Sequence, residues 1–166
     1  MRVIWQGTLI LTAAACALNP TPVPVEGARA DIAALAGEWF GEYRSAETGR
    51  SGSILFMLEA GQDTAHGDVV MVPRQTGVEY DDAMMHTLAH AAPRQQVLRI
   101  RFVRVVGSTV VGTMDPYPSP DCECLLLTTF RGELSGDRIE GAFLVHHSGH
   151  EMTAQKGTWW AKRTKH

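Results

Sequence analysis

The sequence GEWFG at residues 37–41 has a close counterpart in GTWWA at residues 157–161, near the other end of the chain. Both stretches combine glycine with tryptophan and are typical of β-strands. If the strands between them form a closed barrel, these two stretches belong to its first and last strands and must pair with each other. This expected pairing is the basis of the fold prediction.

The segment between them consists of short apolar runs separated by Gly, Ser, Asp and Pro, a pattern that indicates an all-β domain. Alternation is clearest in LRIRF at residues 98–102, where the apolar side chains can face inward while Arg99 and Arg101 face water. Short connections favour up-and-down order. We therefore predict an eight-stranded antiparallel up-and-down β-barrel, with strands at residues 36–43, 52–59, 66–72, 97–105, 108–114, 124–131, 138–145 and 152–163.

Gly37-x-Trp39 resembles the G-x-W signature of the lipocalins and the wider calycin group. In that group the tryptophan closes one end of the barrel, and an arginine from the last strand packs across it. The resemblance implies these two roles for Trp39 and Arg163. Such a contact between a guanidinium and an indole contributes about 1 kcal/mol.

The first residues have the features of an export signal. Arg2 precedes a short apolar stretch at residues 3–15 that ends in small residues, so residues 1–15 are predicted to be a signal peptide. The sequence AAAC at residues 13–16 resembles the lipobox of bacterial lipoproteins, which implies acylation of Cys16; ordinary signal-peptide cleavage is the alternative. The expected location is the periplasmic side of a bacterial cell envelope, lipid-anchored or otherwise secreted.

Length and composition indicate a single folded domain, because 166 residues with 45% hydrophobic content suffice for one core. Residues 16–30, with Pro20, Pro22 and Pro24, are predicted to form a stiff tether, and the barrel is expected to occupy residues 31–166. The formal net charge of -3 argues against nucleic acid as a partner.

Histidines provide the candidate metal ligands. Residues 81–91 are predicted to form a short helical lid, on which Asp82, His86 and His90 share one face. A solvated lid is favoured over a metal site, because the H-E-x-x-H pattern is absent. A second group of histidines, which includes His150, lies at the last hairpin. Histidines at a surface turn are more often solvent-exposed residues than metal ligands. We therefore predict no metal and no cofactor.

If Cys16 is acylated, Cys122 and Cys124 are the two cysteines that remain, an even number that could pair. A disulfide between them would close a small ring, and two free thiols are the alternative. Neither state makes a nucleophile, because the sequence ties no histidine to them. The chain also lacks a nucleophile elbow and a glycine-rich nucleotide loop, so it is not expected to be an enzyme.

The function expected from these features is that of a lipid-anchored binding module that holds a small hydrophobic or amphipathic ligand inside the barrel. The alternative is a structural or accessory lipoprotein that docks on a membrane-protein complex through strands apolar on both faces, such as residues 54–58. The predicted lining residues are Phe56, Met71, Ile100, Phe102, Phe130 and Phe143.

Overall fold

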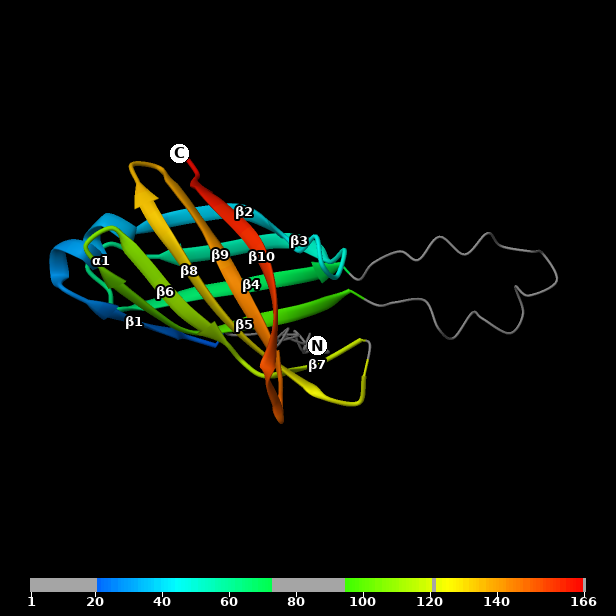
Figure 1. Cartoon of the computed structure of the whole chain (residues 1–166). Helices are drawn as coiled ribbons and strands as arrows, with labels where there is room; N and C mark the ends of the chain where they lie inside the picture. Colours follow the sequence, from blue (N-terminus) through cyan, green and yellow to red (C-terminus); the bar gives the residue numbers. More distant parts are fainter. Residues whose placement is uncertain (1–20, 73–94, 121, 166) are drawn as a thin grey trace, which may run out of the picture.

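The computed structural model describes residues 21–72, 95–120 and 122–165, and most of them lie in strands that form one closed barrel (Figure 1). Successive strands pair in antiparallel fashion, which confirms the predicted all-β barrel. Eight strands overlap the predicted ones: β2 (Gly37–Arg44), β3 (Ser51–Leu58), β4 (Thr64–Val72), β5 (Gln96–Val106), β6 (Thr109–Met114), β8 (Leu125–Ser135), β9 (Arg138–His147) and β10 (His150–Arg163).

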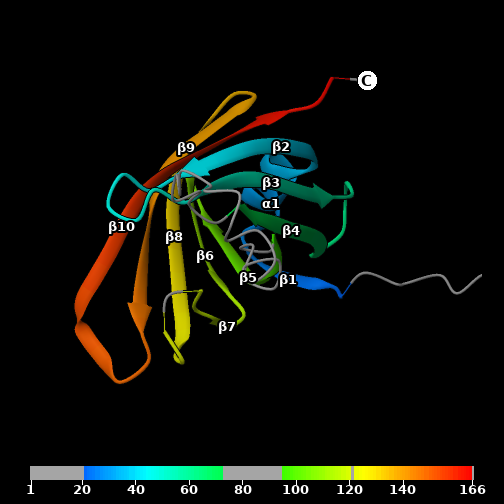
Figure 2. The ribbon, with the colours of Figure 1, turned by 90° about the vertical axis from the view of Figure 1, so that its right-hand side faces the viewer.

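The barrel closes where β10 pairs with β2, as the two tryptophan-bearing stretches led us to expect. In this register Arg163 lies opposite Trp39, and Trp159 lies opposite Tyr43. Figure 2 looks along the barrel and shows the strands arranged as a ring. The two ends of the folded region, separated by more than a hundred residues in the sequence, therefore form one continuous part of the wall.

An additional strand, β1 (Val23–Gly27), corrects the predicted architecture. It pairs antiparallel with β4 and parallel with β5, so the wall formed by the described residues contains nine strands and is not strictly antiparallel. Direct pairing of β4 with β5 covers only residues 68–71 and 96–99, and β1 fills the gap where the two strands diverge.

The predicted tether at residues 16–30 and the domain start at Asp31 were therefore wrong in part. Val23 and Val25 are buried in the core, and the intervening Pro24 is exposed. Prolines at residues 20, 22 and 24 hid this period-two alternation, because proline argues against a strand when tertiary pairing is unknown. A two-residue strand, β7 (Tyr117–Pro118), was also not predicted.

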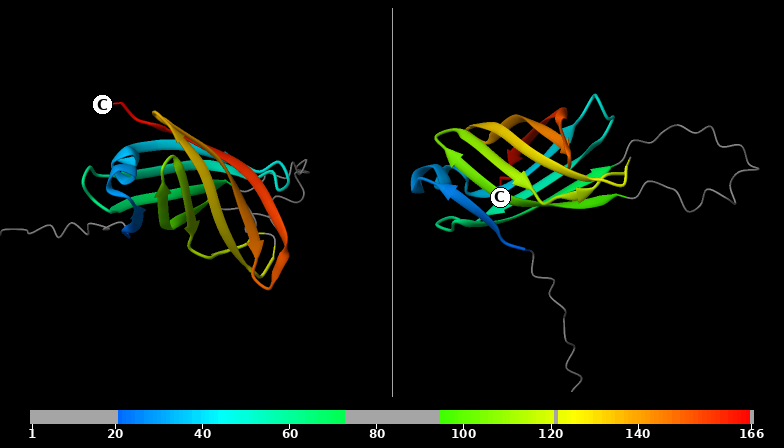
Figure 3. Two further views of the ribbon diagram at one scale, coloured as in Figure 1. Left: turned by 60° about the vertical axis from the view of Figure 1, so that its left-hand side comes forward. Right: turned by 60° about the horizontal axis from the view of Figure 1, so that its bottom comes forward.

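The helix α1 (Arg29–Leu35) covers one end of the barrel, and the β9–β10 hairpin points away from it (Figure 1, Figure 3). Asp31 in its first turn accepts a hydrogen bond from the backbone N–H of Gly107 at 2.9 Å, and Leu35 is buried. The predicted lid at residues 81–91 lies outside the described residues. Within the part of the chain that the structure describes, no helix has the length and apolar character needed to cross a membrane.

The end covered by α1 is closed by Trp39 and Arg163. Trp39 is fully buried and donates its indole N–H to the carbonyl oxygen of Leu35 at 2.8 Å. The Arg163 guanidinium lies 4.4 Å from the centre of the Trp39 ring and donates hydrogen bonds to the carbonyl oxygens of Ala34 and Ala36. These carbonyls at the C-terminal end of α1 would otherwise lack helical partners. Arg163 thus joins the last strand to the helix and to the tryptophan.

A second tryptophan, Trp159, is accommodated by two glycines. Gly132 and Gly141 pair with each other across β8 and β9, and a Cβ atom on either would lie within 2.7 Å of the indole. The indole N–H of Trp159 is shared between the carbonyl oxygens of Arg131 and Ala142, each at 3.2 Å. The glycine pair therefore lets a large ring lie directly against the backbone of the wall.

Replacing Arg163 with methionine is expected to lower the free energy of unfolding by about 2–4 kcal/mol. The change removes the contact with the Trp39 ring and leaves helix carbonyls without donors. Arg131→Met is the matched control, because that side chain is 70% exposed and should contribute less than about 0.5 kcal/mol. Urea denaturation measures both, and equal stability of the two variants would contradict the role assigned to Arg163.

The inclusion of β1 in the wall can be tested at Val25, which is 3% exposed. Val25→Asp is expected to lower the free energy of unfolding by more than about 3 kcal/mol, because it buries a charge. Glu26→Gln should change it by less than about 1 kcal/mol, since the ion pair of Glu26 with Arg104 is exposed. Unchanged thermal unfolding of Val25→Asp would show that residues 23–27 are a tether after all.

Candidate functional site

A cavity of about 100 Å³ lies inside the barrel. For comparison, an engineered protein cavity of about 150 Å³ binds benzene, whereas pockets for drug-sized ligands start at about 300 Å³. Strands β2 to β10 and α1 all contribute to the wall. Its apolar part consists of Leu35, Trp39, Ile54, Phe56, Val69, Met71, Leu98, Ile100, Val103, Val110, Met114, Phe130, Ile139, Phe143, Val145, Trp159 and Ala161.

Five of the six predicted lining residues contribute to this wall: Phe56, Met71, Ile100, Phe130 and Phe143. Phe102 was a wrong prediction. The pairing of β5 with β6 shifts register between Ile100 and Phe102, and this irregularity interrupts the alternation of the strand. Val103 lines the cavity in place of Phe102, whose ring lies 5.4 Å from the guanidinium of Arg104.

Polar side chains line the cavity near its other end, away from α1. Tyr43 is next to last in β2, and Ser45 and Arg50 belong to the turn between β2 and β3. The Ser45 hydroxyl donates to the carbonyl oxygen of Lys156 at 2.9 Å, and its backbone N–H donates to the carbonyl oxygen of Arg50. These contacts hold the turn against β10. The cavity is therefore apolar near α1 and amphipathic at the opposite end.

Two more hydroxyl groups extend this polar end. The hydroxyls of Tyr117 and Thr128 are 3.0 Å apart and share a buried hydrogen bond. Sequence reasoning missed the whole polar set. The sequence indicated only that Tyr43 faces the barrel interior, because it lies four residues after Trp39 and thus on the same face of β2.

Two buried polar atoms in the cavity wall have no hydrogen-bond partner among the described residues: the hydroxyl oxygen of Tyr43 and Oε1 of Gln155. Buried polar groups are nearly always paired, so each such atom requires an explanation. Both residues come from neighbouring strands, β2 and β10. A polar group that enters the cavity would find a donor in the tyrosine and an acceptor in the glutamine amide.

The tyrosines of this region remain neutral at physiological pH. Burial raises the pKa of Tyr43, the neighbouring Tyr117 raises it further, and Arg50 opposes the shift. Burial also raises the pKa of Tyr117, against the lowering effects of its hydrogen bond with Thr128 and of Arg50. Both phenols therefore act as uncharged hydrogen-bonding groups.

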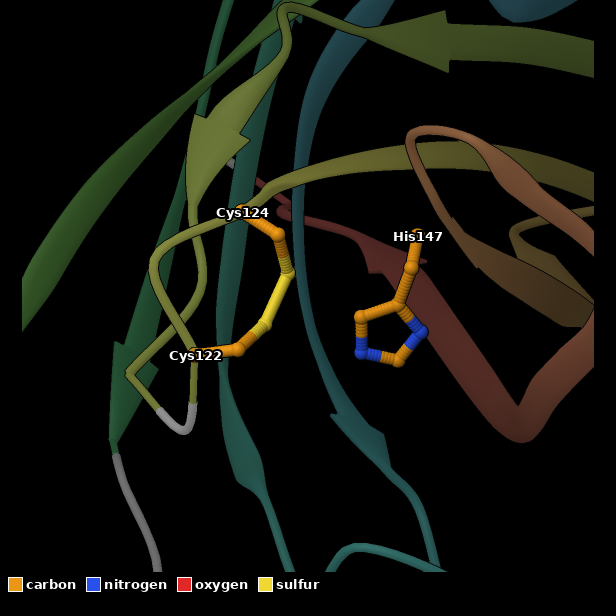
Figure 4. Close-up of side chains that lie close together, drawn as sticks. All are labelled: Cys122, Cys124 and His147. Carbon is orange, nitrogen blue, oxygen red and sulfur yellow. A yellow bond between two sulfur atoms is a disulfide. The ribbon is translucent and has the colours of Figure 1, made fainter.

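A separate cluster lies beside the last hairpin, where Cys122 and Cys124 are joined by a disulfide and His147 points toward them (Figure 4). The ligand atoms of the three residues all lie within 4.8 Å of one another. The sequence gives no reason to associate the cysteine pair with the histidines of the hairpin, because nothing in it relates the loop before β8 to the end of β9.

The remaining predicted site residues are not placed by the structure. Cys16, His86 and His90 lie outside the described residues. The backbone of His150 pairs with that of His147, but the side chain of His150 lies outside the described part of the chain.

Comparison of the chain with protein-family models, with curated proteins and with solved structures gives no match. The features of this barrel that bear on its function are its cavity, its cysteine–histidine cluster and its outer surface.

Proposed function

We propose that this chain is a non-enzymatic binding module that holds one small amphipathic molecule inside its barrel. The observation that carries the proposal is the apolar cavity with two buried, unpartnered polar atoms at its polar end. An apolar body would occupy the space between the aromatic and aliphatic side chains. Its polar group would satisfy Tyr43 and Gln155.

The chemistry of the two atoms narrows the class of ligand. The Tyr43 hydroxyl can donate a hydrogen bond, whereas Oε1 of Gln155 can only accept one. A ligand hydroxyl both accepts and donates, so it can pair with either atom. The cavity volume of about 100 Å³ limits the apolar body to about one ring or a short alkyl chain.

The wider setting of the barrel forms part of the same proposal. The Gly37-x-Trp39 stretch and the position of Arg163 over Trp39 support a calycin-type, lipocalin-like barrel. The apolar N-terminal stretch that ends at Cys16 supports a lipoprotein exported to the periplasmic side of a bacterial envelope. The binding module would then be held at a membrane surface by its acyl chains.

The outer surface favours a second function, docking on a membrane-protein complex. Phe40 on β2 and Leu55 on β3 form a cross-strand pair on the outer face, where they are 50% and 49% exposed. Met57, which is 41% exposed, lies two residues further along β3 on the same face. Adjacent exposed apolar side chains of this size are typical of an interaction surface.

Ligand binding can be tested with benzene and phenol, which differ only by a hydroxyl group. Both are expected to shift the methyl NMR resonances of cavity residues in the full-length chain. In Tyr43→Phe the affinity for phenol should fall by about five- to tenfold, because one hydrogen bond contributes about 1 kcal/mol. The affinity for benzene should stay within about twofold of the parent value.

The matched control is Val69→Phe, which fills the cavity and should abolish the binding of both probes while the circular dichroism of the barrel is retained. Absence of probe-dependent shifts in the parent protein would contradict the binding function and favour docking. Equal loss of benzene and phenol affinity in Tyr43→Phe would contradict the hydroxyl preference.

Lipid anchoring can be tested by expressing the full-length chain in a bacterial host and determining the mass of its N-terminal peptide. We expect this peptide to begin at Cys16 and to carry a diacylglycerol group, and we expect Cys16→Ser to abolish both the modification and the membrane association. A mature terminus elsewhere, without lipid, would instead show ordinary signal-peptide cleavage.

A further inference from the structure

We propose that Cys122, Cys124 and His147, once the disulfide is reduced, form a binding site for a thiophilic metal ion such as Zn²⁺ or Cu⁺. The three side chains converge on one point, and all their ligand atoms lie within 4.8 Å of one another (Figure 4). Two thiolates and one imidazole are a recognised ligand set for zinc, with a fourth position left to water. Soft thiolate ligands also select Cu⁺.

The backbone holds His147 and Cys124 in place independently of the disulfide, and Cys122 lies two residues before Cys124. In the β8–β9 ladder His147 pairs with Leu126, which follows Cys124 by two residues. The N–H of Ser119 donates to the carbonyl oxygen of Cys124 at 2.9 Å, and the N–H of Ser148 donates to that of Leu125 at 2.9 Å. Reduction of the disulfide therefore leaves the histidine and the cysteine loop facing each other.

The spacing of the cysteines suits both the oxidised and the metal-bound state. Their Cα atoms are 5.3 Å apart. Two sulfur atoms that each lie about 2.3 Å from a tetrahedral zinc ion are about 3.8 Å apart. Rotation about the Cα–Cβ bonds can supply this separation without displacing the backbone. The disulfide and the metal are therefore alternative occupants of the same place.

A dithiol is one reductant that converts the disulfide to the metal-binding state. The reductant gives two electrons and two protons to the disulfide, so that its own two thiols become a disulfide and the two cysteines become thiols. Binding of the metal then displaces one proton from each cysteine thiol, and both protons pass to solvent. The two thiolates and the imidazole replace water molecules bound to the ion, and these water molecules also pass to solvent.

The position of the disulfide is suited to such exchange. Cys122 is exposed, and the surface beside the pair is hollowed between Pro118, Glu123, Leu125 and Ser148, which leaves room for an attacking thiol. The cross-link also spans a sequence separation of only two residues. Because the stabilisation by a disulfide grows with the length of the loop that it closes, this one constrains the unfolded chain very little. Its loss should leave the barrel folded.

The test is a metal titration of the full-length chain, with and without prior reduction by a phosphine. We expect the reduced protein to bind one equivalent of Zn²⁺ and the oxidised protein to bind none at the same concentrations. Co²⁺ should give a sulfur-to-cobalt charge-transfer band, which reports thiolate ligation directly. Competition between Zn²⁺ and a Cu⁺ chelate complex identifies the preferred ion.

His147→Gln is expected to weaken binding at least about tenfold, in line with the loss of a ligand, and Cys122→Ser should abolish the charge-transfer band. His146→Gln is the matched control, because it removes the adjacent imidazole, which is not part of the cluster, and should leave the affinity unchanged. Circular dichroism confirms that each variant is folded. Failure of the reduced parent to bind either ion, or equal affinity of His147→Gln and the parent, would overturn the proposal.

Discussion

The pairing of β10 with β2 is the constraint on which the rest of this structure depends. It converts a row of hairpins into a ring, so that one face of every strand encloses a common interior. Arg163 secures the pairing at one end, because it lies opposite Trp39 in the ladder, covers the indole and binds carbonyl groups of α1. Without this closure neither the cavity nor the polar set around Tyr43 would exist.

The two ends of the barrel differ in chemistry. At one end the fully buried Trp39 and the helix α1 exclude water. The indole N–H of Trp39 donates a hydrogen bond to the carbonyl oxygen of Leu35, the last residue of the helix. At the other end the turn that contains Ser45 and Arg50 brings hydroxyl and guanidinium groups to the cavity, and Gln155 of β10 adds an amide. An apolar interior with polar groups at one end suits a ligand that is itself amphipathic.

The cysteine–histidine cluster forms a second site on the same scaffold. It combines a loop between β7 and β8 with the end of β9, and the ladder between β8 and β9 fixes their relative position. The cluster and the cavity use different residues, so ligand binding and metal binding can be altered separately by substitution. The exposed apolar side chains of β2 and β3 form a third feature, on the outer face of the wall.

The sequence by itself determined the all-β class, the eight main strands, the pairing of the tryptophan-bearing ends and five of the apolar lining residues, because alternation and turn residues act locally. Only the tertiary structure decided the rest. Val23 and Val25 join the wall where β4 and β5 diverge, and a shift in strand register excludes Phe102 from the cavity. His147 meets Cys122 and Cys124 because strand pairing joins distant segments, and such contacts leave no periodic signal in the sequence.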